Sequence, residues 1–274
     1  MALYFEEKGH RYTSIDITDQ IKWISASRIA SIFKKPFNAP DQALKASTNK
    51  KSKWYGIPQN EILTIWENEN LRSTTLGTWY HEKEEARLNG LSSLNYKGVE
   101  LPIFRSVWDD GKKFAPDQKL INGVYTELLV YLRSVHMCGQ FDRVNVYNSI
   151  VDIDDHKSNK DLKKPAYVNY EGRSERLLSP LFHLEATKLV EYAIQLSAGM
   201  YMILRNNPQL KPGVLTLNYV TFEVDSEDQF GYPIMKVDDN NEPIIKGIEP
   251  IQVPYLKREI ELILEYLKEK DYNV

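Results

Sequence analysis

The chain has 274 residues, of which 42% are hydrophobic and 27% are charged, and its net charge at pH 7 is −3. These values suit one large or two small globular domains with enough chain to bury a core. The single cysteine, Cys138, excludes an intrachain disulfide and also a four-cysteine iron–sulfur or zinc site built from one chain.

The near-neutral charge shows no global basic signature of a nucleic-acid-binding protein. An enzyme with an acidic active site and a basic channel can still average to this value, so the distribution of charge matters more than its sum. No stretch reaches the length of a membrane span, and the N-terminal residues 1–10 lack the features of a signal peptide. We therefore expect a cytoplasmic protein.

The N-terminal part predicts a β-hairpin followed by a helix. Apolar and aromatic residues in 3–13 and 21–24 flank a turn at residues 8–9, which is typical of antiparallel strands. Serine is a preferred N-cap residue, so the helix is expected to begin near Ser25 or Ser27.

Residues 36–57 form the first lysine-rich segment, and prolines and a glycine interrupt it. This composition predicts a loop or a lid over a site. Lysines beside aromatic rings can follow a phosphate backbone and stack on bases, which makes Lys53 and Trp54 candidate DNA contacts. A solvated loop is the alternative interpretation.

Two helices are predicted next, one that opens at Pro58 and one over residues 74–90. In the second helix, Gly77, His81 and Glu85 are spaced four residues apart, so they share one face. A lone histidine on such a face is an ordinary surface or core residue unless other motifs accompany it.

Residues 91–122 are turn-rich and predict no regular element, whereas residues 124–132 predict a core strand that carries Glu127. A buried carboxylate without a partner is costly or takes up a proton. Glu127 is therefore expected to have a partner or a bound ion.

Residues 139–160 predict two antiparallel strands joined by a short turn. Strand alternation places Asp155 and Lys157 on one face, with Asp142 of the neighbouring strand able to converge on them. Two carboxylates can hold a divalent cation that activates water, while an ammonium group orients the nucleophile and offsets developing charge. A structural ion-pair network is the alternative interpretation of the same residues.

The C-terminal half predicts a loop and then a helix over residues 183–207 that Pro208 ends. Residues 214–224 alternate as a strand, residues 226–243 predict a turn-rich excursion or hairpin, and Pro254 is expected to start a C-terminal helix.

The order of these motifs resembles the PD-(D/E)XK nuclease superfamily, and within it the phage-type RecB-like exonucleases without an iron–sulfur cluster. The matching pieces are the helix with its Gly-x-x-x-His-x-x-x-Glu pattern, a Glu-bearing strand, GQFD at 139–142, DHK at 155–157 and a Gln-bearing helix. The resemblance covers about residues 74–201. It implies an α/β fold with a central mixed β-sheet flanked by helices, in which residues 73–274 form the nuclease core and residues 1–72 add the hairpin, helices and basic loop.

The resemblance also implies roles for individual residues. The implied catalytic residues are Asp142, Asp155, Lys157 and Gln195; the implied Mg²⁺ or Mn²⁺ ligands are His81, Asp142, Asp155, Glu127 and the backbone carbonyl of His156; and Glu85 is a supporting acid. The family has a tyrosine one turn after the glutamine, but this chain has Gly199 there, whereas Tyr192 shares the face of Gln195.

The implied function is a metal-dependent DNA exonuclease that hydrolyses phosphodiester bonds in recombination, repair or replication. DNA is the expected partner, together with a single-strand annealing or single-strand-binding protein, and a phage-encoded enzyme would act in the host cytoplasm. Lys160, Lys163 and Arg173 are further candidate DNA contacts. An endonuclease of the same superfamily and a non-catalytic nucleic-acid-binding protein on the same fold are the alternatives.

Overall fold

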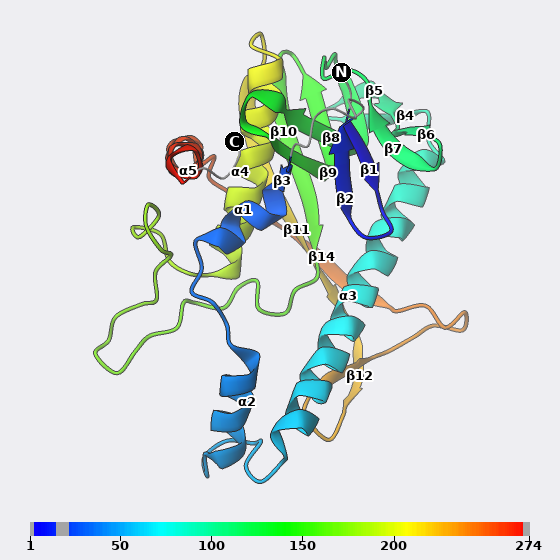
Figure 1. Ribbon diagram of the computed structural model, residues 1–274. Helices are drawn as coiled ribbons and strands as arrows, with labels where there is room; N and C mark the ends of the chain where they lie inside the picture. The colour runs from blue at the N-terminus through cyan, green and yellow to red at the C-terminus, as the bar shows by residue number, and fades with distance from the viewer. Residues whose placement is uncertain (1–2, 15–21, 271–274) are drawn as a thin grey trace.

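The computed structural model describes residues 3–14 and 22–270, and its centre is an eight-stranded mixed β-sheet (Figure 1). Its strands are Ile24–Ser25 (β3), Ser93–Tyr96 (β4), Val99–Phe104 (β5), Gly123–Leu132 (β8), Met137–Tyr147 (β9), Ile150–Lys157 (β10), Lys211–Phe222 (β11) and Ile245–Val253 (β14). The order is β14-β11-β10-β9-β8-β5-β4, and β3 pairs with β9. The pairs β10–β11, β5–β8 and β3–β9 are parallel and the others are antiparallel. The predicted mixed sheet is confirmed.

Helices cover both faces of this sheet. The described residues form the helices Ala26–Ile32 (α1), Ala39–Thr48 (α2), Gln59–Asn89 (α3), Lys188–Asn206 (α4) and Lys257–Glu269 (α5). The largest core lies where α4, flanked by α1 and α5, packs on β8, β9, β10 and β11. On another side of the sheet, Tyr80 of α3 packs with Val220 and Phe222 of β11. None of these helices combines the length and the apolar character that crossing a membrane requires.

A smaller antiparallel sheet lies beside the central one. It contains Leu3–Glu6 (β1), Arg11–Ser14 (β2), Val107–Asp109 (β6) and Lys112–Ala115 (β7), in the order β2-β1-β7-β6. The hairpin predicted for residues 3–13 is confirmed as β1 and β2. The strand expected at 21–24 is different, because Ile24 pairs in parallel with Met137 of β9 and residue 21 lies outside the described residues.

Residues 91–122, where the sequence pattern indicates no particular element, contain the strands β4, β5, β6 and β7. These strands are short, and their partners β1 and β8 come from other parts of the chain. Strand formation depends on such cross-strand neighbours more than on local preference. The strand β14 was not predicted either, and α5 begins at Lys257 rather than at Pro254.

The prediction of a loop over residues 36–57 is wrong, because α2 occupies Ala39–Thr48. The Asn38 side chain caps this helix by accepting a hydrogen bond of 3.2 Å from the Asp41 backbone N–H. Pro40 lies in the first turn, where a missing N–H group breaks no helical hydrogen bond. Ala43, the buried residue of α2, packs with Trp54 and Ile62.

The two helices predicted after residue 58 are one continuous helix, α3, which runs along the molecule in Figure 1. Gly77 does not interrupt it, and the boundary predicted after residue 72 falls inside it. The other predicted elements are observed close to their expected positions. These are α1 with its Ser25 cap, β8, the β9–β10 hairpin, α4, β11 and a two-stranded hairpin of Val224–Glu227 (β12) and Pro233–Met235 (β13).

Candidate metal centre

At the candidate site, the regular alternation of side chains between the two faces of the sheet is interrupted in strands β8 and β9. Tyr125 and Leu128 both pack into the large core, although strict alternation puts residues three apart on opposite faces. Glu127 lies between them with a left-handed φ of 50°, which accounts for the change. The register pairs Thr126 with Arg143 and Leu128 with Phe141, which leaves Glu127 and Asp142 between these two pairs. Leu128 and Phe141 pack into the large core, so the neighbouring carboxylates of Glu127 and Asp142 point away from it.

Three side chains meet on that side of the sheet. The Asp142 Oδ1 atom lies 3.2 Å from Nδ1 of His81 on α3. One ligand atom from each of His81, Glu127 and Asp142 lies within 4.8 Å of the others. Asp142 Oδ2 accepts a hydrogen bond of 2.6 Å from the backbone N–H of His156. Carboxylates and imidazoles are common ligands of divalent metal ions, so this group is able to hold one such ion, whose identity the donor set does not specify.

Asp155 and Lys157 form a second, adjoining pair. They share one face of β10 as predicted, and their side chains form an ion pair. Asp155 does not belong to the group of mutually close ligand atoms formed by the described residues, so its predicted role as a ligand stays a prediction. The Lys157 Nζ atom lies 5.0 Å from the centre of the Tyr192 ring on α4. The aromatic ring next to the Lys157 ammonium group is therefore that of Tyr192. Gln195 lies about one turn further along the same helix, α4.

Burial and neighbouring charges shift the pKa values of the groups at the centre. Burial, reinforced by the Asp142 carboxylate, raises the pKa of Glu127 to about 7. Burial also raises the pKa of Asp155 to about 6, although the Lys157 ammonium opposes this shift. Burial disfavours a charged His81, but the Asp142 carboxylate outweighs burial and raises the pKa of His81 to about 9. A divalent cation at this place would compete with these protons.

A buried lysine lies behind Glu127. Lys113 of β7 is only 1% exposed, and its Nζ atom lies 3.5 Å from Glu127 Oε2. The same Nζ atom lies 3.0 Å from Glu7 Oε1 and 3.8 Å from Glu85 Oε1. The Gln140 side-chain amide also donates to Glu127 Oε2. Glu85 thus reaches the centre through Lys113, a residue that sequence reasoning missed.

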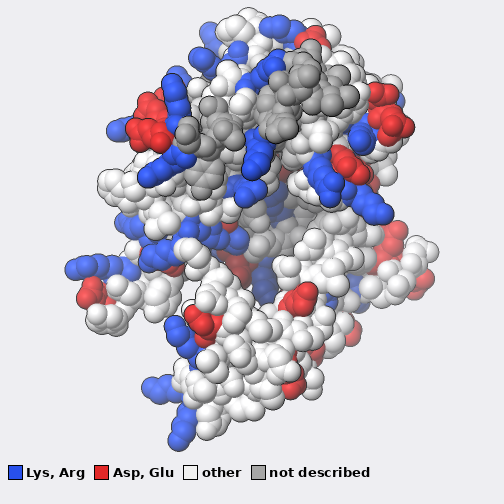
Figure 2. Space-filling view, in the orientation of Figure 1, with Lys and Arg blue, Asp and Glu red and all other residues white. Residues whose placement is uncertain are grey.

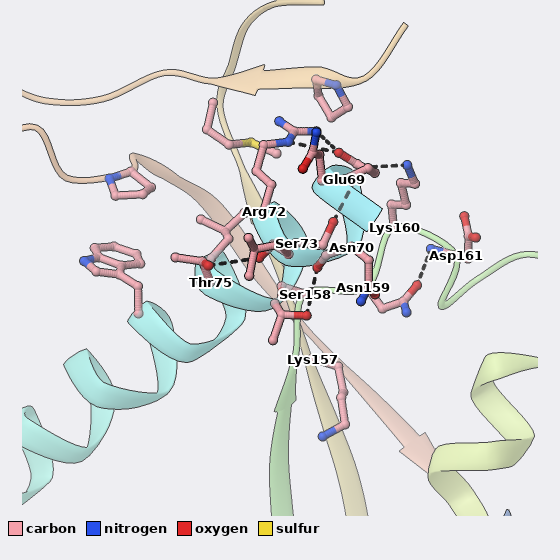
Figure 3. A pocket seen from close by; sticks show the side chains of 18 of the residues that line it. Glu69, Asn70, Arg72, Ser73, Thr75, Lys157, Ser158, Asn159, Lys160 and Asp161 are labelled. Atoms are coloured by element: carbon pink, nitrogen blue, oxygen red, sulfur yellow. Dashed lines mark hydrogen bonds and ion pairs between the residues drawn. The ribbon is translucent and has the colours of Figure 1, made fainter. Parts of the chain in front are cut away.

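A cavity of about 1000 Å³ opens beside the centre. Its wall includes His81, His156, Lys157 and Tyr192, together with polar and apolar residues of α3, polar residues of the segment after β10 and the apolar strand β13. Figure 3 shows Glu69 between Arg72 and Lys160 on this wall. Glu69 Oε2 accepts a hydrogen bond of 2.9 Å from Arg72 Nε, and Glu69 Oε1 lies 3.0 Å from Lys160 Nζ.

The structure separates the predicted DNA contacts into different classes. Trp54 is only 7% exposed and packs on Trp66 and Phe230, so the prediction that it stacks on bases is wrong. Lys53 donates a hydrogen bond of 2.6 Å to the Phe230 carbonyl oxygen. Lys53 and Lys160 both lie over the ring of Tyr232, at 5.0 and 4.6 Å from its centre.

Of the predicted basic contacts after β10, only Lys160 lies on the cavity wall. Lys163 forms an ion pair with Glu249, and Arg173 lies 3.3 Å from Glu171. On the face shown in Figure 2, Lys and Arg side chains of the described residues are interspersed with Asp and Glu in the upper part, while the lower part is mostly uncharged.

The centre combines three side chains able to hold a metal ion, a largely buried ammonium group and an adjoining cavity whose wall has both charged and apolar side chains. Such a combination can bind a phosphate-bearing substrate and stabilise negative charge that develops on it. The chain matches no protein-family model and no curated protein.

Proposed function

We propose that the protein is a metal-dependent deoxyribonuclease that hydrolyses phosphodiester bonds from the end of a DNA strand. The observation that carries the proposal is the convergence of His81, Glu127 and Asp142 next to the Asp155–Lys157 pair, at one end of a cavity. The resemblance of these same residues to the RecB-like nucleases supports it, and it is the reason for favouring DNA and an exonuclease.

In this proposal Asp142, Glu127 and His81 hold Mg²⁺ or Mn²⁺. The bound cation lowers the pKa of a water molecule and polarises the phosphodiester. Lys157 orients the attacking water and offsets negative charge on the phosphate oxygens. Asp155 holds the Lys157 ammonium in place through Oδ2, which leaves its Oδ1 atom available for a role as a fourth ligand.

In this proposal the substrate lies in the cavity next to these groups. Arg72 and Lys160 lie on its wall, and both are held by Glu69. Their positive groups can bind phosphates of the strand that leads to the centre, because ammonium and guanidinium groups recognise phosphate oxygens. The Tyr192 ring beside Lys157 offers an apolar surface for a base or sugar.

The test is a cleavage assay on end-labelled linear DNA with Mg²⁺ or Mn²⁺ and with EDTA. Asp142→Ala, Asp155→Ala and Lys157→Ala are each expected to reduce the rate by about 10²-fold or more, which is the scale seen when one transition-state contact is removed. Lys257→Ala in α5 is the control, because Lys257 is exposed and does not line the cavity.

Thermal melting and circular dichroism check that each variant is folded. Cleavage in EDTA, or turnover of Asp142→Ala at the wild-type rate, contradicts the proposal. Binding of DNA without cleavage in either metal would instead support the non-catalytic alternative on the same fold.

A further inference from the structure

The small antiparallel sheet contributes one side chain to the metal centre. Lys113 of β7 lies opposite Phe5 of β1 and opposite Trp108 of β6. Its Nζ atom is 5.5 Å from the centre of the Trp108 ring, and the residue is buried. A buried ammonium group is costly unless carboxylates or other acceptors surround it. Its surroundings therefore indicate why it is there.

Three carboxylates from three different elements surround this ammonium group. They come from Glu7 after β1, from Glu85 of α3 and from Glu127 of β8, at 3.0, 3.8 and 3.5 Å. Carboxylates that converge from separate elements are also the surroundings that proteins build for divalent cations. Here the centre of the group is the Lys113 ammonium.

Glu127 belongs to this group and also to the metal ligands. Its Oε2 atom faces Lys113 and Gln140, while its carboxylate lies within 4.8 Å of the ligand atoms of His81 and Asp142. A cation beside each side of one carboxylate is the arrangement of a two-metal centre, in which a carboxylate lies between two ions. In this protein one of the two positions holds an ammonium group.

We propose that Lys113 is a built-in second cation, so that its ammonium group fills the position beside Glu127 and the centre binds one exchangeable divalent cation. This inference rests on the metal centre of the proposed function. Lys113 acts as a positioning residue, since it orients Glu127 toward His81 and Asp142 without touching the substrate. The three carboxylates together carry more negative charge than the Lys113 ammonium group can balance. The remaining negative charge favours binding of the single divalent ion.

The experiment counts Mn²⁺ ions bound to the full chain by calorimetry and by electron paramagnetic resonance, without any substrate. Wild type and Lys113→Arg are expected to bind one isolated Mn²⁺ per chain. Lys113→Ala is expected to bind two, because it leaves three carboxylates around an open position. Adding Glu85→Gln to Lys113→Ala removes one of these carboxylates and is expected to return the count to one.

Two Mn²⁺ ions in the wild type, or a folded Lys113→Ala that binds only one, overturn the inference. If circular dichroism shows that Lys113→Ala is unfolded, the test uses the number of Mn²⁺ ions bound to the wild type and to Lys113→Arg. One isolated ion per chain supports the inference, and a spin-coupled pair overturns it. One bound ion without DNA cleavage contradicts the proposed function alone, whereas cleavage with two bound ions contradicts this inference alone. The absence of any Mn²⁺ binding contradicts both.

Discussion

Replacing Gly199 by alanine tests how tightly α4 packs on the strand that carries Asp142. A Cβ atom built on Gly199 would lie 2.3 Å from Cζ of Phe141, and 2.5 Å from its Cε1, closer than the 3.0 Å below which real Cβ contacts essentially do not occur. Phe141 is fully buried, so its ring can move only by displacing other core residues. Overpacking of this kind costs about 1–3 kcal/mol.

The matched control is Gly77→Ala in α3. The nearest atom to a Cβ at Gly77 is Ser158 Oγ at 3.4 Å, which is an ordinary contact. Both substitutions gain about 1 kcal/mol of helix propensity, so this gain cancels when the two variants are compared. Gly199→Ala is therefore expected to be less stable than Gly77→Ala by about 1–3 kcal/mol.

The assay is thermal melting followed by circular dichroism, with urea unfolding as a second measurement. For a domain of this size, the expected difference corresponds to about 2–12 °C in Tm between the two variants. Because Phe141 precedes Asp142, we also expect Gly199→Ala to weaken Mn²⁺ binding, whereas Gly77→Ala leaves it unchanged. Equal melting temperatures for the two variants would refute the packing argument.

Three further outcomes are expected. In EDTA, stability should fall as pH rises from about 5 to about 9, because three groups bind protons more tightly in the folded protein than in the unfolded chain. Their pKa values are about 6 against an ordinary 3.8 for Asp155, about 7 against 4.5 for Glu127 and about 9 against 6.5 for His81. Glu127→Gln should reduce the fall in stability below about pH 7, and melts that stay level over this range would disagree. Calorimetric Mn²⁺ affinity should rise between pH 6 and 9, since the cation displaces the protons of Glu127 and His81. His81→Ala should weaken binding and remove the part of this dependence above about pH 8, and an unchanged affinity in His81→Ala would remove it from the ligand set. Linear DNA should be degraded while a covalently closed circle survives, and rapid cutting of the circle would favour an endonuclease.

Much of the central sheet could be predicted because its signals are local. The β9–β10 hairpin follows from alternating apolar residues on both sides of a short turn, and this pattern also places Asp155 beside Lys157. The joint position of His81 and Asp142 could be anticipated only from the order of several motifs, because the contact joins a helix to a strand.

Lys113 could not be found in this way. Nothing in the local sequence distinguishes it from its neighbour Lys112, which the structure leaves on the other side of the same strand. Its burial depends on β1 and β6 and on carboxylates far away in the chain. Trp54 is a similar case, because its partner Phe230 lies in a distant hairpin.

Gly199 shows how a departure from a family pattern can have a structural reason. The resemblance leads one to expect a tyrosine at this position, but the Phe141 ring fills the space beside it. The sequence shows the glycine and the phenylalanine separately, and only the packing of α4 on β9 relates the two.

The continuity of α3 limits how this protein can vary in length. His81 contacts Asp142 and Trp66 contacts Trp54, and one uninterrupted helix joins His81 and Trp66. Inserting one residue into an α-helix rotates everything beyond it by about 100° and moves it by about 1.5 Å. A single insertion between Trp66 and His81 would therefore either move the imidazole away from Asp142 or disrupt the packing of Trp66 on Trp54. In related sequences we expect insertions in the loops, and an unchanged spacing between these two positions.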